Sequence, residues 1–203
     1  MKNILFDYGR TIVEHPADNA GLEIVKRRGV QGKEAYLVRN AIFSSGNFLN
    51  DLDEGKMSRE EYHKLLVKSL PAHLHQKAIE ASDYHITELG FIKGMAELIE
   101  DLRRDGFKLY ITSNMSKLHA EQMYHTEIAK HFDGMIFSSE IKIGKPHREF
   151  FEKALERFGV LAQDCLFIDD MKENVLGAKA VGIDGYVFCG DSDEARKFIY
   201  NNA

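Results

Sequence analysis

Short apolar runs alternate with helical patterns from about residue 91 to the C-terminus. The runs lie at 108–112, 134–138, 165–169 and 185–188, and the helical patterns lie at 95–105, 116–130, 147–158 and 173–181. The runs are apolar throughout and lack the period-two alternation of a half-exposed strand, which is typical of strands covered on both faces. This order predicts an α/β fold, a Rossmann-like doubly wound parallel sheet, and KNILF at 2–6 is a further run of the same kind.

Only helical patterns fill the long interval between KNILF and the other runs. Residues 18–28 and 33–44 carry apolar positions at spacings of one, three and four. Ser58 and Glu61 form an S-x-x-E capping box, and Pro71 opens or interrupts the next helix. We therefore predict two domains. Residues 1–14 and 91–203 form the core, and residues 15–90 form a small inserted helical bundle, with proline and glycines at its borders as in a hinge.

Composition and charge narrow the class of partner. Lys and Arg number 27 against 32 Asp and Glu, and the net charge of −5 provides no basic field for nucleic acid or an anionic membrane. No stretch approaches the roughly 20 apolar residues of a membrane span. Cys165 and Cys189 lie in apolar runs and are interpreted as small buried hydrophobes in a reducing compartment rather than as a disulfide. We therefore predict a cytoplasmic protein without nucleic-acid or membrane partners.

Polar residues follow the predicted strands, and ligands of open parallel sheets bind at the carboxyl ends of the strands. Lys145 stands between Gly144 and Pro146, which fix its backbone in the segment that follows the run at 134–138. The other polar residues at strand ends are Asp7, Thr11, Thr112, Ser113, Asn114, Asp169, Asp170 and Asn174. Carboxylates, a hydroxyl and an ammonium group on one edge are the groups needed for phosphoryl transfer through a covalent aspartyl intermediate.

Four motifs in this order, FDYGRT, YITSN, IGKP and FIDDMKEN, together resemble those of the haloacid dehalogenase superfamily. The helical insert between the first two resembles the type-one cap of that superfamily. Within it, SNMSKLH, GKPHREFF and DDMKENVLGA are most similar to the small-sugar phosphatases related to bacterial α-glucose-1-phosphate phosphatase. The resemblance implies a Mg²⁺-dependent phosphatase that hydrolyses a small phosphorylated metabolite, such as a sugar phosphate.

The resemblance also implies a role for each matching residue. Asp7 would be the nucleophile, and Asp7, Asp170 and the backbone carbonyl of Gly9 would ligate Mg²⁺. Ser113 and the amide of Asn114 would bind phosphate oxygens, and Lys145 would bridge Asp7 and the phosphate. Three residues would hold these groups in place without touching the metal: Asp169, Asn174 and Thr11. Arg10 is a further phosphate-binding candidate that could instead face solvent.

Gly9 stands where most phosphatases of this family carry a second aspartate, which protonates the leaving alcohol and then activates water. General acid–base catalysis contributes roughly 10²–10⁴-fold, so its loss would slow the enzyme without abolishing its activity. Either a neighbour substitutes, with Glu14, His15 and Asp18 the nearest candidates, or the substrate has a leaving group that needs little protonation. We favour the second explanation, and the absence of the aspartate argues against a phosphomutase.

Two other functions compete with the phosphatase. A metal-independent haloacid dehalogenase uses the same aspartate, but the tyrosine pattern after Asp7 differs and the pair Asp169 and Asp170 suits a metal better. A catalytically weak phosphate-binding regulatory protein would explain Gly9 alone. Singly, Asp7 could be a turn cap, Lys145 a surface lysine and Asp169 a helix cap, but the joint pattern at the strand ends favours catalysis.

The remaining polar signals are interpreted as structural. The segment 51–61 is similar to a calcium loop but has Lys56 where the loop needs glycine, so we expect a loop that enters a capped helix. His73 and His75 are expected to be solvated, and His15 and His119 to be polar residues at the rim of the site. Three aromatic residues of the insert are expected to form its core, with one or two roofing the site: Phe43, Phe48 and Tyr62.

Overall fold

Five parallel strands form one sheet in the computed structural model, which describes residues 3–43 and 47–202. The strand order is β3-β2-β1-β4-β5, with β1 (Asn3–Phe6) in the centre. The other strands are β2 (Lys108–Ser113), β3 (Gly134–Phe137), β4 (Cys165–Asp169) and β5 (Asp184–Val187). Each strand begins and ends within one residue of a predicted run. The first residue of the run at 2–6, Lys2, lies outside the described residues. The prediction of a doubly wound parallel sheet is confirmed.

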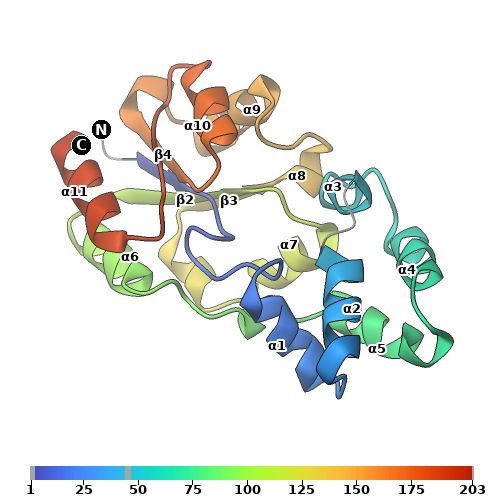
Figure 1. Cartoon of the computed structure of the whole chain (residues 1–203). Coiled ribbons are helices and arrows are strands. Elements are labelled where there is room, and N and C mark those ends of the chain that lie inside the picture. Colours follow the sequence, from blue (N-terminus) through green and yellow to red (C-terminus); the bar gives the residue numbers. More distant parts are fainter. Residues whose placement is uncertain (1–2, 44–46, 203) are drawn as a thin grey trace.

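Helices cover both faces of the sheet because successive residues of each strand point to opposite sides. Ile4 and Phe6 of β1 pack with α6 (Met95–Arg104), α7 (Lys117–Met123) and α11 (Ser192–Asn202). Leu5, between them, packs with α9 (Arg148–Phe158) and α10 (Lys172–Lys179) on the other face. Figure 1 shows α9 and α10 above the sheet and α6 and α7 below it. This two-sided burial explains why the strands read as continuous apolar runs.

The helix predicted over 116–130 is wrong in its second half. α7 ends at Met123, and only a short 3-10 turn, η3 (Ile128–His131), follows. The Thr126 hydroxyl donates to the Met123 carbonyl (2.8 Å) and accepts from the Ala129 amide (3.3 Å). Threonine here competes for the backbone groups that a continuous helix would pair, so the chain turns instead.

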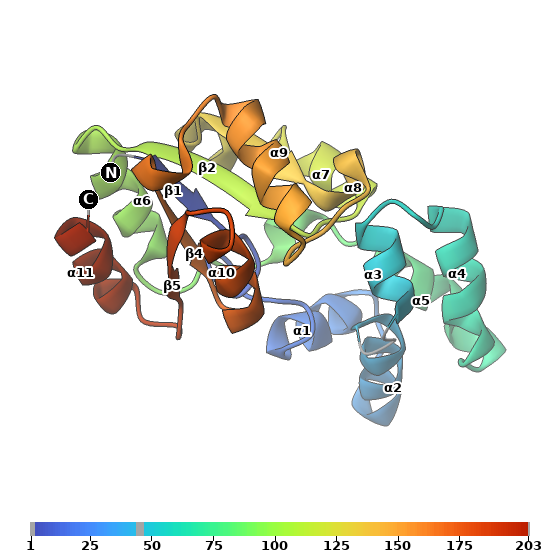
Figure 2. The same cartoon turned by 90° about the horizontal axis from the view of Figure 1, so that it is seen from above.

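The described part of the insert consists of helices that lie together beside the sheet (Figure 2). They are α1 (Asn19–Arg27), α2 (Gly32–Phe43), α3 (Asn47–Asp53), α4 (Arg59–Lys68) and α5 (His75–Ser82), with the 3-10 turns η1 (Ala72–Leu74) and η2 (Ile86–Glu88). The predicted capping box of Ser58 and Glu61 is confirmed at the start of α4. The last residue of the helix predicted over 33–44 lies outside the described residues.

The two connections between sheet and insert lie side by side. Val13, which follows β1, forms an antiparallel bridge with Phe91, which precedes α6. The chain therefore leaves and re-enters the core at one place, and the division into residues 1–14, 15–90 and 91–203 stays a prediction.

Two further short elements complete the core, α8 (Ser138–Ile141) and the 3-10 turn η4 (Ala162–Asp164).

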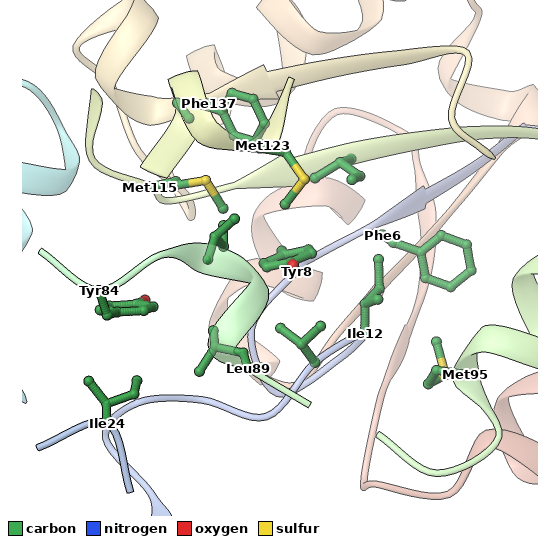
Figure 3. Packing of buried hydrophobic residues seen from close by; sticks show 14 of the residues in the cluster. Phe6, Tyr8, Ile12, Ile24, Tyr84, Leu89, Met95, Met115, Met123 and Phe137 are labelled. Atoms are coloured by element: carbon green, nitrogen blue, oxygen red, sulfur yellow. The ribbon is translucent and has the colours of Figure 1, made fainter. Parts of the chain in front are cut away.

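Buried residues of sheet and insert form one continuous hydrophobic cluster. Phe6 and Met95 of the core belong to the same cluster as Ile24 and Tyr84 of the insert. Tyr8, just beyond the end of β1, is 5% exposed, and Figure 3 shows its ring among residues of both parts. The insert therefore packs directly against the segment that leaves the central strand.

Cys165 is buried in β4 as predicted, but the prediction that Cys189 is buried is wrong. Cys189 follows β5 and is exposed, because the strand ends at Val187 and the chain turns towards α11. Both cysteines are free. In the described residues, no helix has the length and apolar composition needed to cross a bilayer.

Candidate active site

Three predicted carboxylates meet where β1 and β4 end. The two strands are parallel neighbours with Phe6 opposite Ile168, so Asp7 and Asp169 are the next residues along each. Oxygens of Asp7, Asp169 and Asp170 lie within 4.8 Å of one another. Asp7 is 8% exposed, Asp169 is fully buried and Asp170 is half-buried. Carboxylates packed this closely and shielded from water repel each other unless cations lie beside them.

Lys145 supplies one such cation. Its Nζ lies 2.7 Å from Oδ1 of Asp7 and 2.6 Å from Oδ2 of Asp169, and its side chain is 1% exposed. Burial alone would lower the pKa of Lys145, but Asp169 and Asp7 outweigh burial and raise that pKa. Burial raises the pKa of Asp7 to about 7, with Asp169 acting in the same direction and Lys145 against it. Lys145 therefore stays charged, and a further cation beside Asp7 would also favour the ionised carboxylate.

Asp169 is fully engaged in hydrogen bonds. Besides Lys145, it accepts from Nδ2 of Asn174 at 3.0 Å on both oxygens and from the Met171 amide at 2.8 Å. Asn174 lies in the first turn of α10 and is buried, so the start of this helix holds the Asp169 carboxylate in place. The structure thus brings Asp169 and Asn174 together with Lys145, and the contact of Lys145 with Asp169 is one that the sequence analysis does not include.

The side chain of Asn114 bonds the backbone of Lys145. Its Oδ1 accepts from the Lys145 amide at 2.8 Å, and its Nδ2 donates to the Lys145 carbonyl at 3.0 Å. The sequence identifies Asn114 only through its own amide, as a ligand of phosphate oxygens. The contact of its side chain with Lys145 could not be predicted, because 31 residues separate the pair.

Asp170 differs from Asp169 in having room for a ligand. In the described part of the chain, its carboxylate has no ion pair and no hydrogen bond from another side chain. Burial raises the pKa of Asp170, with Asp169 adding to this, and Arg10 and Lys145 oppose it. A half-buried carboxylate that no other side chain bonds, beside two other carboxylates, is a suitable oxygen donor for a divalent cation.

Three other predicted residues have different surroundings. Oγ of Ser113 makes one long contact, 3.5 Å to the Asn114 carbonyl, and so has a weak partner. Thr11 is buried, but its Oγ1 has no hydrogen-bond partner in the structure of residues 3–43 and 47–202, so the structure does not bring it into contact with a metal ligand. Arg10 has a left-handed φ of 55°, and its guanidinium forms two bonds to Asp18, at 2.9 and 3.1 Å.

A cavity of about 100 Å³ separates this edge of the sheet from the insert. Gly9, Ser113 and Asn114 line it from the core, although Asp7 does not. The insert contributes mostly aromatic and apolar side chains: Ile42, Phe43, Leu49, Leu52, Tyr62, Tyr84 and Ile86. Phe43 and Tyr62 line the cavity, whereas Phe48 is 44% exposed, so the expectation that Phe48 lies in the core of the insert is wrong.

Two histidines also line the cavity, in different ways. Both ring nitrogens of His119 have partners, Nδ1 with Oγ of Ser116 at 3.1 Å and Nε2 with the Tyr84 carbonyl at 3.2 Å. The His15 ring instead lies against Gly9: a Cβ built on Gly9 would be 2.8 Å from its Cδ2. His73, as expected, is exposed and pairs with Glu34.

The sequence analysis missed Asp53, the last residue of α3. It lines the cavity, and its carboxylate accepts a hydrogen bond from the Ser116 amide. Its backbone carbonyl accepts from the Ser138 hydroxyl of α8. Burial raises the pKa of Asp53 to about 8, with Glu54 adding to this and the Ser116 amide opposing it. No local pattern identifies Asp53, because its partners lie more than 60 residues away in the chain.

Comparison with known proteins places this geometry in a family. Residues 48–188 match the family of haloacid dehalogenase-like hydrolases. The chain is 27% identical over 191 residues to the glyceraldehyde 3-phosphate phosphatase of Methanocaldococcus jannaschii, covering 90% of this chain and 82% of that protein.

Two solved structures share the fold. A HAD family enzyme from Bacteroides thetaiotaomicron, in complex with magnesium and inorganic phosphate, has a TM-score of 0.72 at 20% identity and covers 98% of this chain and 99% of its own. The L-2-haloacid dehalogenase of Xanthobacter autotrophicus has a TM-score of 0.68 at 18% identity, with 98% of this chain and 83% of its own covered. Because the two enzymes carry different names and share this fold, the choice of reaction depends on the site.

Proposed function

The chain belongs to the family of haloacid dehalogenase-like hydrolases, and on that premise we propose that it is a Mg²⁺-dependent phosphatase acting on a small phosphorylated metabolite. The observation that carries the proposal is the buried Lys145, held between Asp7 and Asp169 with Asp170 alongside. We assign Asp7 to the attack and, together with Asp170, to a cation, and we assign Asp169 to fixing the lysine.

Asp7 is the proposed nucleophile. One of its oxygens attacks phosphorus, an aspartyl-phosphate forms, and the bond to the leaving oxygen breaks. Water then cleaves the aspartyl-phosphate and releases inorganic phosphate. Lys145 stays charged through both steps and offsets the negative charge that the phosphate brings to a buried site.

The donor set fits Mg²⁺. The proposed ligands are Asp7, Asp170 and the Gly9 carbonyl, all hard oxygen donors of the kind this cation prefers. Asp169 is less suitable, because its oxygens already accept from Lys145, Asn174 and Met171. When bound, Mg²⁺ would supply positive charge to the phosphate oxygens and orient them for attack.

The remaining core residues bind the phosphate or position the residues that do. Ser113 has only a weak partner for its hydroxyl and lines the cavity. We therefore propose that this hydroxyl and the Asn114 amide donate hydrogen bonds to the phosphate oxygens. Arg10 contributes its charge from a distance, since Asp18 holds its guanidinium. Thr11 supports the loop from its buried position and Asn174 fixes Asp169.

Residues 15–90 are the proposed cap over a core of residues 1–14 and 91–203. The adjacent connections at Val13 and Phe91 support this division, and the resemblance to type-one caps agrees with it. With the glyceraldehyde 3-phosphate phosphatase as a relative, we propose a small sugar phosphate, hydrolysed in the cytoplasm by a member of the α-glucose-1-phosphate phosphatase group.

The test is phosphate release from a panel of sugar phosphates and p-nitrophenyl phosphate, with Mg²⁺ and with EDTA. We expect release that requires Mg²⁺ and is lost in Asp7→Asn, whereas Asp193→Asn, an exposed carboxylate on α11, keeps it. Release that survives in EDTA or in Asp7→Asn would contradict the mechanism. Halide release from 2-chloropropionate without phosphate release would show the dehalogenase instead.

A further inference from the structure

The His15 ring occupies the space that a side chain at residue 9 would take. A Cβ on Gly9 would lie 2.8 Å from Cδ2 of His15 and 3.8 Å from both Cγ and Nε2. The φ of Gly9 is not in the left-handed region, so its backbone would accept an L-residue. The glycine is therefore explained by the ring beside it, and a carboxylate at residue 9 would require the ring to move.

A backbone contact fixes which nitrogen of this ring carries the proton. The Ala17 amide donates to Nδ1 of His15 at 3.1 Å, so Nδ1 is an acceptor and the proton of the neutral ring is on Nε2. The ring is thus a neutral donor through Nε2–H.

Nε2 is left as a donor beside the site. The His15 ring lines the cavity together with Gly9, Ser113 and Asn114. In the described part of the chain its Nε2 has no hydrogen-bond partner. His15 is half-buried, so its Nε2–H is free to donate to an oxygen of a ligand that enters beside Gly9.

The other two candidates near Gly9 are already engaged or turned away. Asp18 is exposed and pairs with Arg10 through both carboxylate oxygens. Glu14 is exposed, and its carboxylate lies against Gly90, 3.4 Å from where a Cβ on that residue would be. His15 is the one of the three whose ring lies against Gly9.

We propose that His15 is a catalytic residue whose Nε2–H donates a hydrogen bond to the oxygen of the leaving group, in place of the carboxylic acid missing at residue 9. The proposal rests on the phosphatase function above. As Asp7 bonds to phosphorus, the bond from phosphorus to the leaving oxygen breaks, and its electron pair goes to that oxygen. His15 keeps its proton and stabilises the developing charge, and water supplies the proton that completes the alcohol.

A donor that keeps its proton helps poor leaving groups most, because more charge develops on their oxygen. The test compares kcat/KM for a sugar phosphate with that for p-nitrophenyl phosphate, each with Mg²⁺. We expect His15→Ala to lower kcat/KM for the sugar phosphate by about 10²-fold. The loss in kcat/KM for p-nitrophenyl phosphate should be smaller by a factor of about ten or more. His15→Gln, which retains an N–H near the Nε2 position, recovers most of the loss.

The paired change at residue 9 gives an independent test. Gly9→Asp alone meets the His15 ring, so we expect lower activity and a lower Tm than in the wild type. In Gly9→Asp combined with His15→Ala, the ring is gone and the carboxyl group takes its place. This double variant should hydrolyse the sugar phosphate faster than His15→Ala does, by about tenfold or more.

The outcomes separate this proposal from the phosphatase function. Equal losses on both substrates in His15→Ala, with Gln no better than Ala, would mean that the ring only supports the loop and would overturn the catalytic role. Wild-type release that depends on Asp7 and Mg²⁺ would meanwhile uphold the phosphatase. No release of either substrate by the wild type overturns both, and circular dichroism confirms that each variant is folded.

Discussion

The sheet edge and the wall of the insert that faces it are built in opposite ways. At the edge, charged groups are buried and tied to one another, and Lys145 and Asp169 are almost fully enclosed. The facing wall is aromatic and apolar, with Asp53 as a carboxyl group at the cavity. Ion pairs of the insert, such as that of Arg28 with Glu88, lie away from this wall. Under the proposed function, the edge would determine which reaction is possible, and the wall would select the molecule that undergoes it.

Lys145→Met is the most severe way to break the edge. It leaves Asp7 and Asp169 buried without their ammonium partner, so we expect phosphatase activity to fall about 10³-fold. The free energy of unfolding in EDTA should drop by about 3–5 kcal/mol. Mg²⁺ should restore part of that stability, because it supplies positive charge to the same carboxylates. Urea unfolding in EDTA and in Mg²⁺ measures both effects.

Lys130→Met is the matched control, since Lys130 forms an exposed pair with Glu127. Exposed pairs are worth about 0–1 kcal/mol, so this variant should keep its activity and nearly all its stability. If the two variants lost similar stability, the buried lysine would not be the cation that holds the edge together.

Asn114→Ala tests the edge through geometry rather than charge. The side chain makes two hydrogen bonds to the Lys145 backbone, at 2.8 and 3.0 Å. Without them Nζ shifts from its place between the carboxylates, and we expect kcat to fall about 10–100-fold. The two lost bonds should also reduce stability by about 1–3 kcal/mol.

Asn3→Ala is the control for this change, because Asn3 bonds the Asp164 carbonyl at the opposite end of β1. Its loss should leave kcat within about twofold of the wild type while costing about 0.5–1.5 kcal/mol. A wild-type kcat in Asn114→Ala would show that proline and glycine around the lysine position it without help.

The edge was largely predictable and the wall was not. Asp7 follows one run that is covered on both faces and Asp169 ends another, so their place at the edge follows from the strand pattern. The link from Asn114 to Lys145 and the contact of Asp53 with Ser116 join residues far apart in sequence. Helix patterns give the buried face of each helix but not how helices pack together, so Asp53 could be found only in the folded chain.

Asp53→Asn tests whether the carboxyl group on the wall of the insert is protonated in the folded protein. The carboxyl group has its pKa raised to about 8 in the folded protein, mainly by burial, against 3.8 as its ordinary value. Between these values the folded state binds a proton that the unfolded state does not, so stability falls as pH rises from about 4 to about 8. Asparagine does not titrate, so we expect the wild-type Tm to fall by about 6–12 °C more than that of the variant between pH 5.5 and pH 8.

Asp51→Asn, two residues earlier on α3, serves as the control and should keep the wild-type dependence on pH. Thermal unfolding followed by circular dichroism at three pH values is sufficient. Parallel curves for the wild type and Asp53→Asn would mean that the carboxyl group is ionised in the folded protein, and the wall would then resemble the edge.

Arg10→Gly has the smallest expected effect and tests where the edge stops. Arg10 has a φ of 55°, which costs a non-glycine residue about 1–2 kcal/mol, and glycine relieves that cost. The variant also loses an exposed ion pair with Asp18 worth about 0.2–1 kcal/mol. Glycine raises the conformational entropy of the unfolded chain as well, which lowers stability. These terms oppose one another, so stability should stay within about 1 kcal/mol of the wild type. Asp18→Asn, which breaks the pair and keeps the backbone, separates the two contributions.

Inhibition by inorganic phosphate then decides the role of the guanidinium. Since Asp18 holds it, we expect the inhibition constant to rise less than about threefold in Arg10→Gly, as a charge acting from a distance through water would give. A rise of about tenfold or more would correspond to at least 1.4 kcal/mol and to a direct bond with the phosphate. Arg10 would then release Asp18 when the ligand binds, and the edge that sets the chemistry would extend onto the segment leading to the insert.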